Sequence, residues 1–403
     1  LLNHLPYHKT MLVREKYLQK IRPYYDSEQI KLISGVRRCG KSVLLSQIAE
    51  ELENRANSHV VYINLEDYSY RDFWDNPKEF HSYLKSKIQG KTYFLLDEIQ
   101  HVSEFESVLA SLKATTNASL FATGSNSTLL SGKLASRLTG RVKEFLVRPF
   151  SFAESNAFAD ISLKDYLLLG GFPLRFQEKE ANEALRIVKG IYESILTKDI
   201  YPDMAQSLKT AFECFATFVL QESGNLISMQ KVSQYLSNFH QKTSVPTLYT
   251  YLRKLQESYI IGMMDRFDIT GKKEMQYIRK VYAMDPAFIT INKAGNNEEG
   301  FGFSLETVIG NELQDRGYAV YVGKMYNGEI DFIAKKNQET SYVQVATYME
   351  TKETKDREFS QLLKIKDNYP KYVISMDNEN FSHDGITHIN ANDFLLGKTS
   401  HLL

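Results

Sequence analysis

The chain has 403 residues, of which 43% are hydrophobic and 24% are charged, with 49 Lys and Arg balanced by 49 Asp and Glu. These values are typical of a folded protein of two to four domains, and they exclude a disordered chain, a collagen-like chain and a coiled-coil rod. The zero net charge excludes a uniformly basic nucleic-acid coat, but it leaves a local basic surface open.

Cysteine content and hydropathy indicate a cytoplasmic protein. Cys39 and Cys214 are too few for a disulfide framework or a cysteine-rich zinc site, and they fit a reducing compartment. No apolar run approaches the roughly 20 residues that span a bilayer, and the first ten residues lack the features of a secretory signal. We therefore expect no membrane association, and we expect residues 1–10 to be an extension upstream of the regular segment that begins at Met11.

Residues 11–155 alternate between short apolar runs and amphipathic stretches. The predicted helix covers residues 43–52, and the predicted strands cover residues 29–34, 60–65, 92–96 and 119–123, with a further candidate over 142–147. Continuous apolar strands separated by helices are typical of a parallel sheet covered on both faces. The predicted fold class of this domain is therefore α/β.

The sequence GVRRCGKS fits the pattern G-x-x-x-x-G-K-[ST] in full, after a predicted strand and before a predicted helix. Glycines allow the loop to turn its N–H groups inward around phosphate oxygens, and the following helix N-terminus favours negative charge. We expect Lys41 to reach the β- and γ-phosphates of ATP and Ser42 to ligate Mg²⁺. The predicted nucleotide-binding residues of the loop are Gly35, Val36, Arg37, Arg38, Cys39, Gly40, Lys41 and Ser42.

The two arginines and the cysteine of this loop are interpreted individually. The side chains of Arg37 and Arg38 could face the nucleotide or a neighbouring subunit, but exposure to solvent is the preferred interpretation. Cys39 is interpreted as a small filling residue.

Two acidic residues follow the predicted strand TYFLL. Asp97 and Glu98 stand at the end of this strand, and the carboxyl ends of parallel strands face the ligand crevice of such a sheet. We expect Asp97 to hold Mg²⁺ through water and Glu98 to act as the general base that polarises the attacking water.

Two further groups complete the predicted site. The strand SLFAT ends in small polar residues, so that Asn126 or Ser125 could bond the γ-phosphate and orient water, with Thr123 as another candidate. Arg141, with Arg137 as a weaker candidate, precedes the last predicted strand. An arginine placed there could reach a γ-phosphate bound to an adjacent subunit of an oligomer.

These motifs resemble those of the AAA-type ATPases within the larger P-loop group that carries a catalytic glutamate. The chain resembles more closely a prokaryotic ATPase family that adds a C-terminal module of unassigned function. The resemblance spans residues 11 to 397 and is carried by GVRRCGKSVLL, LLDEIQ, FATGSNS, LTGR, RPFSFAE, GGFP, NGEIDFIA and YPKYVISMD. It implies an ATPase, but it does not identify what the protein acts on; we expect a homo-oligomer as the active state.

A helical region is predicted over residues 156–225, and a winged-helix domain over 226–290. The second domain reads as helix, turn, helix and β-hairpin, and residues 205–283 hold ten Lys and Arg against six Asp and Glu. Such a module binds duplex DNA when its second helix enters the major groove; the alternative is a solvated scaffold that relays motion or packs subunits. The candidate DNA-contacting residues are Thr247, Thr250, Arg253, Lys254, Lys272 and Lys273.

Residues 301–403 follow a polar linker and are predicted to form a restriction-endonuclease-like domain. Asp331 stands where that fold places a metal-binding acid, with Glu306 as a possible extra acid. The third strand, however, reads Gln344-Val345-Ala346, which lacks the carboxylate and the lysine that cleavage needs. Lys335 or Lys324 could substitute, but we expect an inactive scaffold.

The sequence supports three hypotheses. The first is an ATP-hydrolysing switch or motor that acts on DNA or a protein partner. The second is a nucleotide-regulated binding module with negligible turnover. The third, which we consider the weakest, is an ATP-dependent nuclease.

Overall fold

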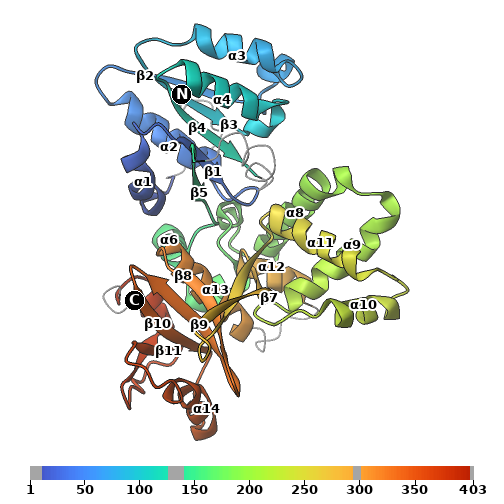
Figure 1. The fold of residues 1–403 in the computed structure, drawn as a ribbon, viewed down its shortest axis with the longest axis vertical. Helices are drawn as coiled ribbons and strands as arrows, with labels where there is room; N and C mark the ends of the chain where they lie inside the picture. The colour runs from blue at the N-terminus through green and yellow to red at the C-terminus, as the bar shows by residue number, and fades with distance from the viewer. Residues whose placement is uncertain (1–10, 126–139, 294–300, 400–403) are drawn as a thin grey trace. The chain divides into compact units, whose positions relative to one another are not determined.

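The computed structural model describes residues 11–125, 140–293 and 301–399. The chain divides into two compact units: the first runs to Pro149 and includes Glu257–Tyr259, and the second takes Phe150–Gln256 and the chain from Ile260 onward. Figure 1 shows the elements of each unit. Among the described residues, no helix has the length and apolarity that would let it cross a membrane.

The first unit contains a five-stranded parallel sheet in the order β2-β3-β4-β1-β5. Its strands are β1 (Ile30–Ser34), β2 (Ser58–Asn64), β3 (Lys91–Asp97), β4 (Ser119–Gly124) and β5 (Val142–Leu146). The prediction of a parallel α/β sheet is therefore confirmed. Because β4 lies between β1 and β3, it separates the loop that follows β1 from the acidic end of β3.

The described helices of the first unit cover both faces of this sheet. They are α1 (Glu15–Ile21), α2 (Lys41–Glu53), α3 (Pro77–Ser86) and α4 (Phe105–Thr115). Helix α2 contacts β2, β3 and β4 and carries α1 on its outer side, whereas α3 and α4 pack together on the other face (Figure 1). One core cluster joins alternate strand residues, such as Phe94 and Leu96, to apolar residues of α3 and α4 such as Phe80 and Leu109. Burial on both faces explains why these strands are continuous apolar runs.

The second unit opens with a run of helices, α6 to α11, and α12 follows a pair of strands. These helices are α6 (Phe152–Ala159), α7 (Leu163–Leu169), α8 (Ala181–Ile195), α9 (Gln206–Gln221), α10 (Met229–Asn238), α11 (Val245–Glu257) and α12 (Pro286–Asn292). The predicted helix break at residues 170–173 is confirmed, since Gly170 follows α7 with a φ of 70°. A side chain at Gly170 would lie 1.8 Å from the carboxylate of Asp285, which also accepts the N–H of Gly171.

A mixed seven-stranded sheet follows, in the order β12-β11-β10-β9-β8-β6-β7. Its strands are β6 (Ile261–Asp268), β7 (Lys273–Ala283), β8 (Ala319–Met325), β9 (Gly328–Lys336), β10 (Glu339–Ala346), β11 (Lys371–Ser375) and β12 (Ile386–Asn390), and the remaining helices are α13 (Phe301–Asp315), α14 (Lys352–Leu363) and α15 (Ala391–Leu395). The predicted strands around residues 318–323, 328–334, 341–347 and 371–375 are all present.

The hairpin of β6 and β7 is continuous with this C-terminal sheet. Residues 266–268 of β6 pair in parallel with residues 322–324 of β8, and the N–H of Ile269 donates to the carbonyl of Lys324 at 3.0 Å. The strands that were predicted as the wing of a separate domain therefore form the β6–β7 end of the seven-stranded sheet.

Candidate functional site

The loop between β1 and α2 has the backbone of a phosphate cradle. Gly35 has a φ of 147° and Gly40 a φ of 101°, which favour glycine. A Cβ atom at Gly35 would lie 2.1 Å from the carbonyl oxygen of Val147, so no other residue fits there without a shift. Gly40 is the N-cap of α2, and no side chain caps this helix end.

Lys41 is buried inside the loop that it follows. Its Nζ atom donates to the carbonyl oxygens of Gly35 at 3.0 Å and Val36 at 3.2 Å. These carbonyls hold the ammonium group without neutralising its charge. Ser42 lies in the first turn of α2, directly after Lys41.

The acidic pair lies at the end of β3 and is fixed by three hydroxyl and amide donors. Asp97 accepts the hydroxyl of Tyr62 at 3.0 Å on one oxygen and the hydroxyl of Thr123 on the other. Burial and the charge of Asp97 both raise the pKa of the Tyr62 hydroxyl, so Tyr62 remains a donor at neutral pH.

Glu98 has a left-handed backbone with a φ of 53°. Its N–H donates to the Thr123 hydroxyl at 2.9 Å, and its carboxylate accepts the side-chain amide of Gln100. A non-glycine residue in this conformation is uncommon and is held by its surroundings, which is a frequent property of functional positions.

This donor set fits a magnesium–nucleotide complex. An uncapped helix N-terminus and a buried ammonium group suit phosphate, and hydroxyl and carboxylate oxygens suit Mg²⁺. Gly35, Lys41, Ser42 and Asp97 are the residues that would hold the nucleotide and its metal ion.

The loop residues Arg37, Arg38 and Cys39 differ in how deeply their side chains are buried. The Arg37 side chain is largely buried and forms an ion pair with Glu66 at 3.7 Å, so it does not fit the preferred interpretation of a solvent-facing side chain. Arg38 is exposed and has a φ of 66°. Cys39 is fully buried; its thiol donates to the carbonyl of Val147 at 3.3 Å, and burial raises its pKa.

The residues at the end of β4 that were predicted to contact the γ-phosphate are described only in part. Asn126 and Arg137 lie outside the described residues, so their predicted roles stay predictions. Ser125 is buried. Thr123, which was one of three candidates, is the residue that contacts both acids.

Arg141 lies at the amino ends of the parallel strands, whereas the phosphate loop lies at their carboxyl ends. It immediately precedes β5, and its carbonyl accepts the N–H of Ile30, the first residue of β1. At about 3.3 Å per residue, the length of β1 separates it from Gly35 by roughly 16 Å. The side chain of Arg141 is exposed, and it lies far from the phosphate loop of its own chain.

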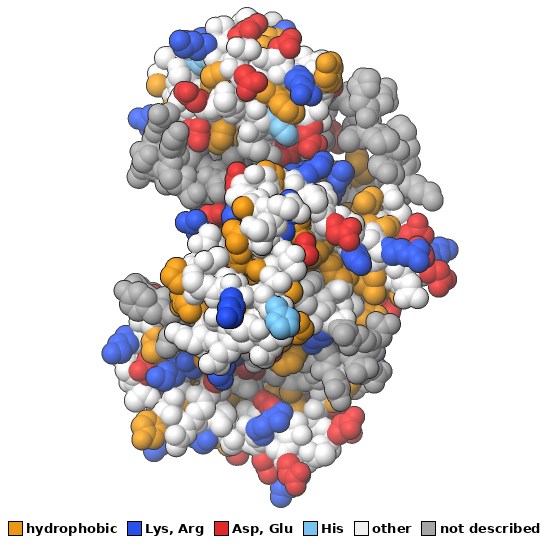
Figure 2. Space-filling model, turned by 90° about the vertical axis from the view of Figure 1, so that its right-hand side faces the viewer, with side chains coloured by type: hydrophobic (Ala, Val, Ile, Leu, Met, Phe, Trp, Pro, Cys, Tyr) orange, Lys and Arg blue, Asp and Glu red, His pale blue; other side chains and the backbone are white. Residues whose placement is uncertain are grey.

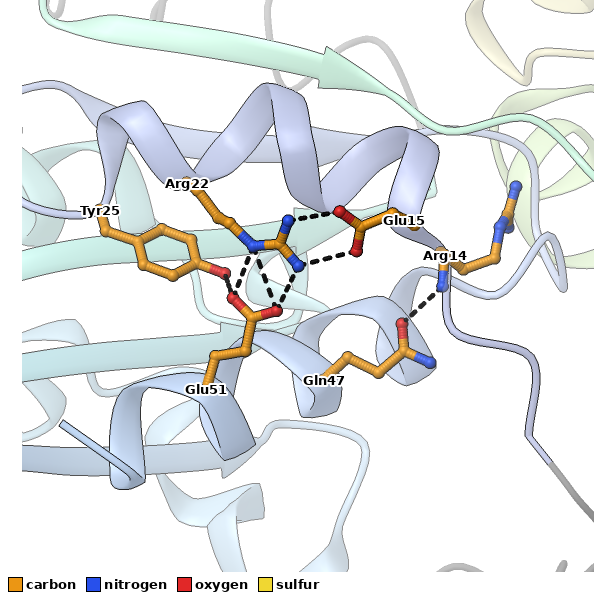
Figure 3. Close-up of polar contacts among 6 residues, drawn as sticks. All are labelled: Arg14, Glu15, Arg22, Tyr25, Gln47 and Glu51. Atoms are coloured by element: carbon orange, nitrogen blue, oxygen red, sulfur yellow. Dashed lines mark hydrogen bonds and ion pairs between the residues drawn. The ribbon is translucent and has the colours of Figure 1, made fainter.

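Three residues that surround the candidate site of the first unit, Tyr62, Arg14 and Gln47, were not predicted from the sequence. Tyr62 could have been found, because it is the polar residue of the strand VVYIN that pairs beside β3. Arg14 and Gln47 carried no motif. Arg14 is fully buried and donates to the carbonyl of Cys39 in the phosphate loop. Figure 3 shows Arg14 with Gln47 beside α2.

In the second unit, the candidate DNA-contacting residues occupy two places. On α11, Leu248, Tyr251, Leu252 and Leu255 are buried, whereas Thr250 and Arg253 are exposed and Thr247 and Lys254 are partly exposed. Lys272 and Lys273 are exposed at the turn between β6 and β7. Among the described side chains on the face shown in Figure 2, positive and negative groups are interspersed, with no single field of one sign.

The acids predicted for a nuclease-like site meet a lysine that was not predicted. Lys280 of β7 reaches Glu306 of α13 at 3.6 Å and also contacts Glu329 of β9. Tyr282 donates to Glu306 at 2.9 Å, and Asp331 accepts the N–H of Val345 at 2.7 Å. Burial raises the pKa of both Glu306 and Asp331.

The two lysines considered as substitutes lie elsewhere. The ammonium group of Lys335 stands 3.4 Å from the centre of the Phe267 ring, and the Lys324 side chain has no described contact with these acids. Within residues 11–125, 140–293 and 301–399, no group of three or more His, Cys, Asp and Glu side chains is arranged to hold a metal ion. The structure therefore supports an acidic cluster balanced by Lys280.

Comparison with known proteins gives two family matches along the chain. Residues 27–156 match a family described as "AAA domain", and residues 160–297 match one described as "Domain of unknown function (DUF8612)". An uncharacterized protein of Haemophilus influenzae is 35% identical over 407 residues, covering 96% of this chain and 99% of its own length. Uncharacterized protein MJ1544 of Methanocaldococcus jannaschii is 26% identical, covering 88% of this chain and 83% of its own length.

Solved structures show weaker similarity. The Walker-type ATPase PABY2304 of Pyrococcus abyssi is 18% identical, with a TM-score of 0.45, and it covers 70% of this chain and 96% of its own.

Proposed function

We propose that this chain, which belongs to the family of the Haemophilus influenzae protein and carries an AAA domain, binds ATP with Mg²⁺ and hydrolyses it to ADP and phosphate. The observation that carries the proposal is the arrangement of three neighbouring strand ends. The phosphate loop follows β1, the acidic pair ends β3, and Thr123 on the intervening β4 bonds both acids.

Each residue then has a role that its position supports. The loop N–H groups and Lys41 bind the phosphates, and Ser42 and Asp97 hold Mg²⁺, which supplies charge stabilisation for phosphoryl transfer. Glu98 accepts a proton from the attacking water at its carboxylate, while Thr123 keeps the Glu98 backbone in place. Asn126 or Ser125 is proposed to orient that water.

We propose a homo-oligomer as the active state. Arg141 is too far along the sheet from its own phosphate loop, but its exposed side chain could complete a site on a neighbouring subunit. Mixing Arg141→Ala subunits with Glu98→Gln subunits tests this, because activity should be recovered in mixed assemblies. Absence of recovery would contradict a shared site.

The central experiment measures phosphate release by the wild type, Lys41→Ala and Glu98→Gln. Lys41→Ala should lose nucleotide binding, whereas Glu98→Gln should keep binding and lose turnover. Equal turnover in all three proteins would contradict the proposal. Binding without turnover in the wild type would instead favour a nucleotide-regulated module, in which ATP stabilises one arrangement of the two units.

The second unit is proposed to carry the partner-binding function. Helices α10 and α11 with the β6–β7 hairpin have the order of a winged helix, and α11 exposes Thr250 and Arg253 beside its buried apolar side. We propose that α11 contacts duplex DNA, with Lys272 and Lys273 on phosphates. Fluorescence anisotropy with a labelled duplex tests this contact. Arg253→Ala should weaken binding and reduce its salt dependence.

The alternative to DNA is a protein partner. A pull-down with the Glu98→Gln protein in the presence of ATP, scored for both DNA and protein, distinguishes the two. The C-terminal sheet with α13 is proposed to be an inactive nuclease-like scaffold, because Gln344 and Ala346 replace the residues that cleavage needs. Nicking of supercoiled DNA that disappears in Asp331→Ala would contradict this.

A further inference from the structure

Arg14 lies outside the matched AAA domain, which begins at residue 27, yet it contacts the phosphate loop inside that domain. It is among the most deeply buried side chains of the protein. One guanidinium nitrogen donates to the carbonyl of Cys39 at 3.1 Å, and another donates to the carbonyl of Arg148 at 3.1 Å. A single planar group therefore joins the loop to the segment that follows β5.

Cys39 is held through each of its polar atoms. Its N–H donates to the carbonyl of Val36, its thiol donates to the carbonyl of Val147, and its carbonyl accepts from Arg14. In a trans peptide the C=O and the next N–H point in opposite directions, and the described chain has no cis peptide bond. The contact with Arg14 therefore turns the N–H of Gly40 away from Arg14.

Arg14 is itself fixed on α2 and α1. Its backbone N–H donates to the side-chain oxygen of Gln47 at 3.1 Å, and the Gln47 amide donates to the carbonyl of Leu12 at 2.9 Å. The guanidinium carbon lies 4.6 Å from the centre of the Tyr17 ring, and the Tyr17 hydroxyl accepts the N–H of Arg148. The segment before the domain thus contacts both the phosphate loop, at Cys39, and the chain that follows β5, at Arg148.

The same segment makes a second contact with the domain, and this contact does not involve the phosphate loop. Arg22 bonds the carboxylates of Glu15 and Glu51, and Tyr25 donates to Glu51 at 2.8 Å (Figure 3). This network is partly exposed and lies between α1 and α2. It attaches the segment to the domain but touches no residue from 35 to 42, so it provides a matched control.

We infer that Arg14 is a positioning residue of the phosphate loop, which orients the Cys39–Gly40 peptide so that its N–H can bind the β-phosphate of the nucleotide. The inference rests on the proposed function, from which it takes ATP or ADP as the ligand of the loop. A lysine could reach one of the two carbonyls but not both, because it lacks the planar fork of donors.

The test compares Arg14→Met, Arg14→Lys and the control Arg22→Met in the full chain. Displacement of a fluorescent ADP analogue by ATP, ADP and AMP gives the affinities. Arg14→Met should lose at least tenfold in affinity for ATP and ADP, and the preference for ADP over AMP should shrink by a similar factor. Arg14→Lys should lose part of that preference. Arg22→Met should lower the melting temperature and keep the preference within twofold of the wild type.

Several results would overturn the inference. One is an Arg14→Met protein with the wild-type preference for ADP over AMP; if that variant does not fold, the same result in Arg14→Lys overturns it. Another is an equal loss for all three nucleotides in the Arg14 variants and in Arg22→Met, which indicates a merely structural role.

Hydrogen exchange without nucleotide separates this inference from the proposed function. In Arg14→Lys, the amides of the peptide that contains residues 35–42 should exchange at least fivefold faster than in the wild type and in Arg22→Met. Unchanged exchange would overturn the role of Arg14. A wild-type protein that binds no ATP would instead contradict the proposed function.

Discussion

The hydroxyl of Thr123, near the end of β4, donates a hydrogen bond to the carboxylate of Asp97 at the end of β3. The same hydroxyl accepts the N–H of Glu98 at 2.9 Å. One small side chain therefore orients the proposed metal-binding acid and the backbone of the proposed general base. A hydroxyl that donates and accepts at the same time has little freedom to rotate.

Replacing this hydroxyl should slow ATP turnover more than it weakens binding. Thr123→Val keeps the shape of the side chain but leaves a buried N–H unpaired, at a cost of about 1–3 kcal/mol. We expect the turnover number to fall roughly tenfold to hundredfold. Steady-state phosphate release and nucleotide titration measure the two effects. Thr123→Ser should recover most of the activity, and a Thr123→Val enzyme as fast as the wild type would contradict the role.

Gly35→Ala should abolish nucleotide binding. The added Cβ would lie 2.1 Å from the carbonyl of Val147, and a backbone carbonyl cannot move away without shifting β5 or the loop. The control is Gly90→Ala, since Gly90 also has a positive φ but no atom within 4 Å of an added Cβ. That control should cost about 1 kcal/mol of stability and keep nucleotide binding. Titration with a fluorescent nucleotide measures binding, and equal affinities in the two variants would contradict the steric argument.

The phosphate loop and the acidic pair could be predicted because they depend on local sequence. A glycine-rich loop between a strand and a helix has few alternatives, and parallel strands bring their carboxyl ends to one edge of the sheet. The same reasoning could not select Thr123 over its neighbours, because that choice depends on the order of strands, with β4 between β1 and β3.

Other features depend on contacts between distant segments. Arg14 meets Cys39 and Arg148 only after the chain has folded, and no periodicity marks it. The β6–β7 hairpin was predicted as a local pair, but its parallel pairing with β8 joins segments more than 50 residues apart. Lys280 of β7 meets Glu306 of α13, so the sequence around Asp331 alone could not reveal this contact.

Lys31 should make the first unit more stable as the pH rises above 7. Its ammonium group is buried in β1, donates to Ser119 at 2.6 Å, and lies 4.5 Å from the centre of the Phe121 ring. Burial lowers the pKa of Lys31 to about 7. Between pH 7 and 10 the unfolded chain therefore binds more protons at this residue than the folded chain, so the free energy of unfolding increases with pH.

Lys31→Met removes the titrating group and tests this dependence. The wild type should gain stability between pH 7 and 9 relative to the variant, by at most about 1.4 kcal/mol per pH unit. The variant should be the more stable protein at pH 6, where the buried charge is present. Denaturant unfolding at each pH measures the difference, and parallel stability curves for the two proteins would contradict a lowered pKa.

Lys280 should stabilise the second unit by balancing the acids around it. In Lys280→Met, Glu306 and Glu329 lose a buried cation, and breaking a buried ion pair from one side costs about 3–5 kcal/mol. The raised pKa values of Glu306 and Asp331 mean that the folded state favours their protonated forms, so stability falls as the pH rises through those values. The loss caused by Lys280→Met should therefore be larger at pH 8 than at pH 5.

Adding Glu306→Gln to Lys280→Met should restore part of the lost stability, because it removes one of the uncompensated charges. Thermal unfolding of the single and double variants at both pH values measures this coupling, and strictly additive effects would show that Lys280 and Glu306 do not interact.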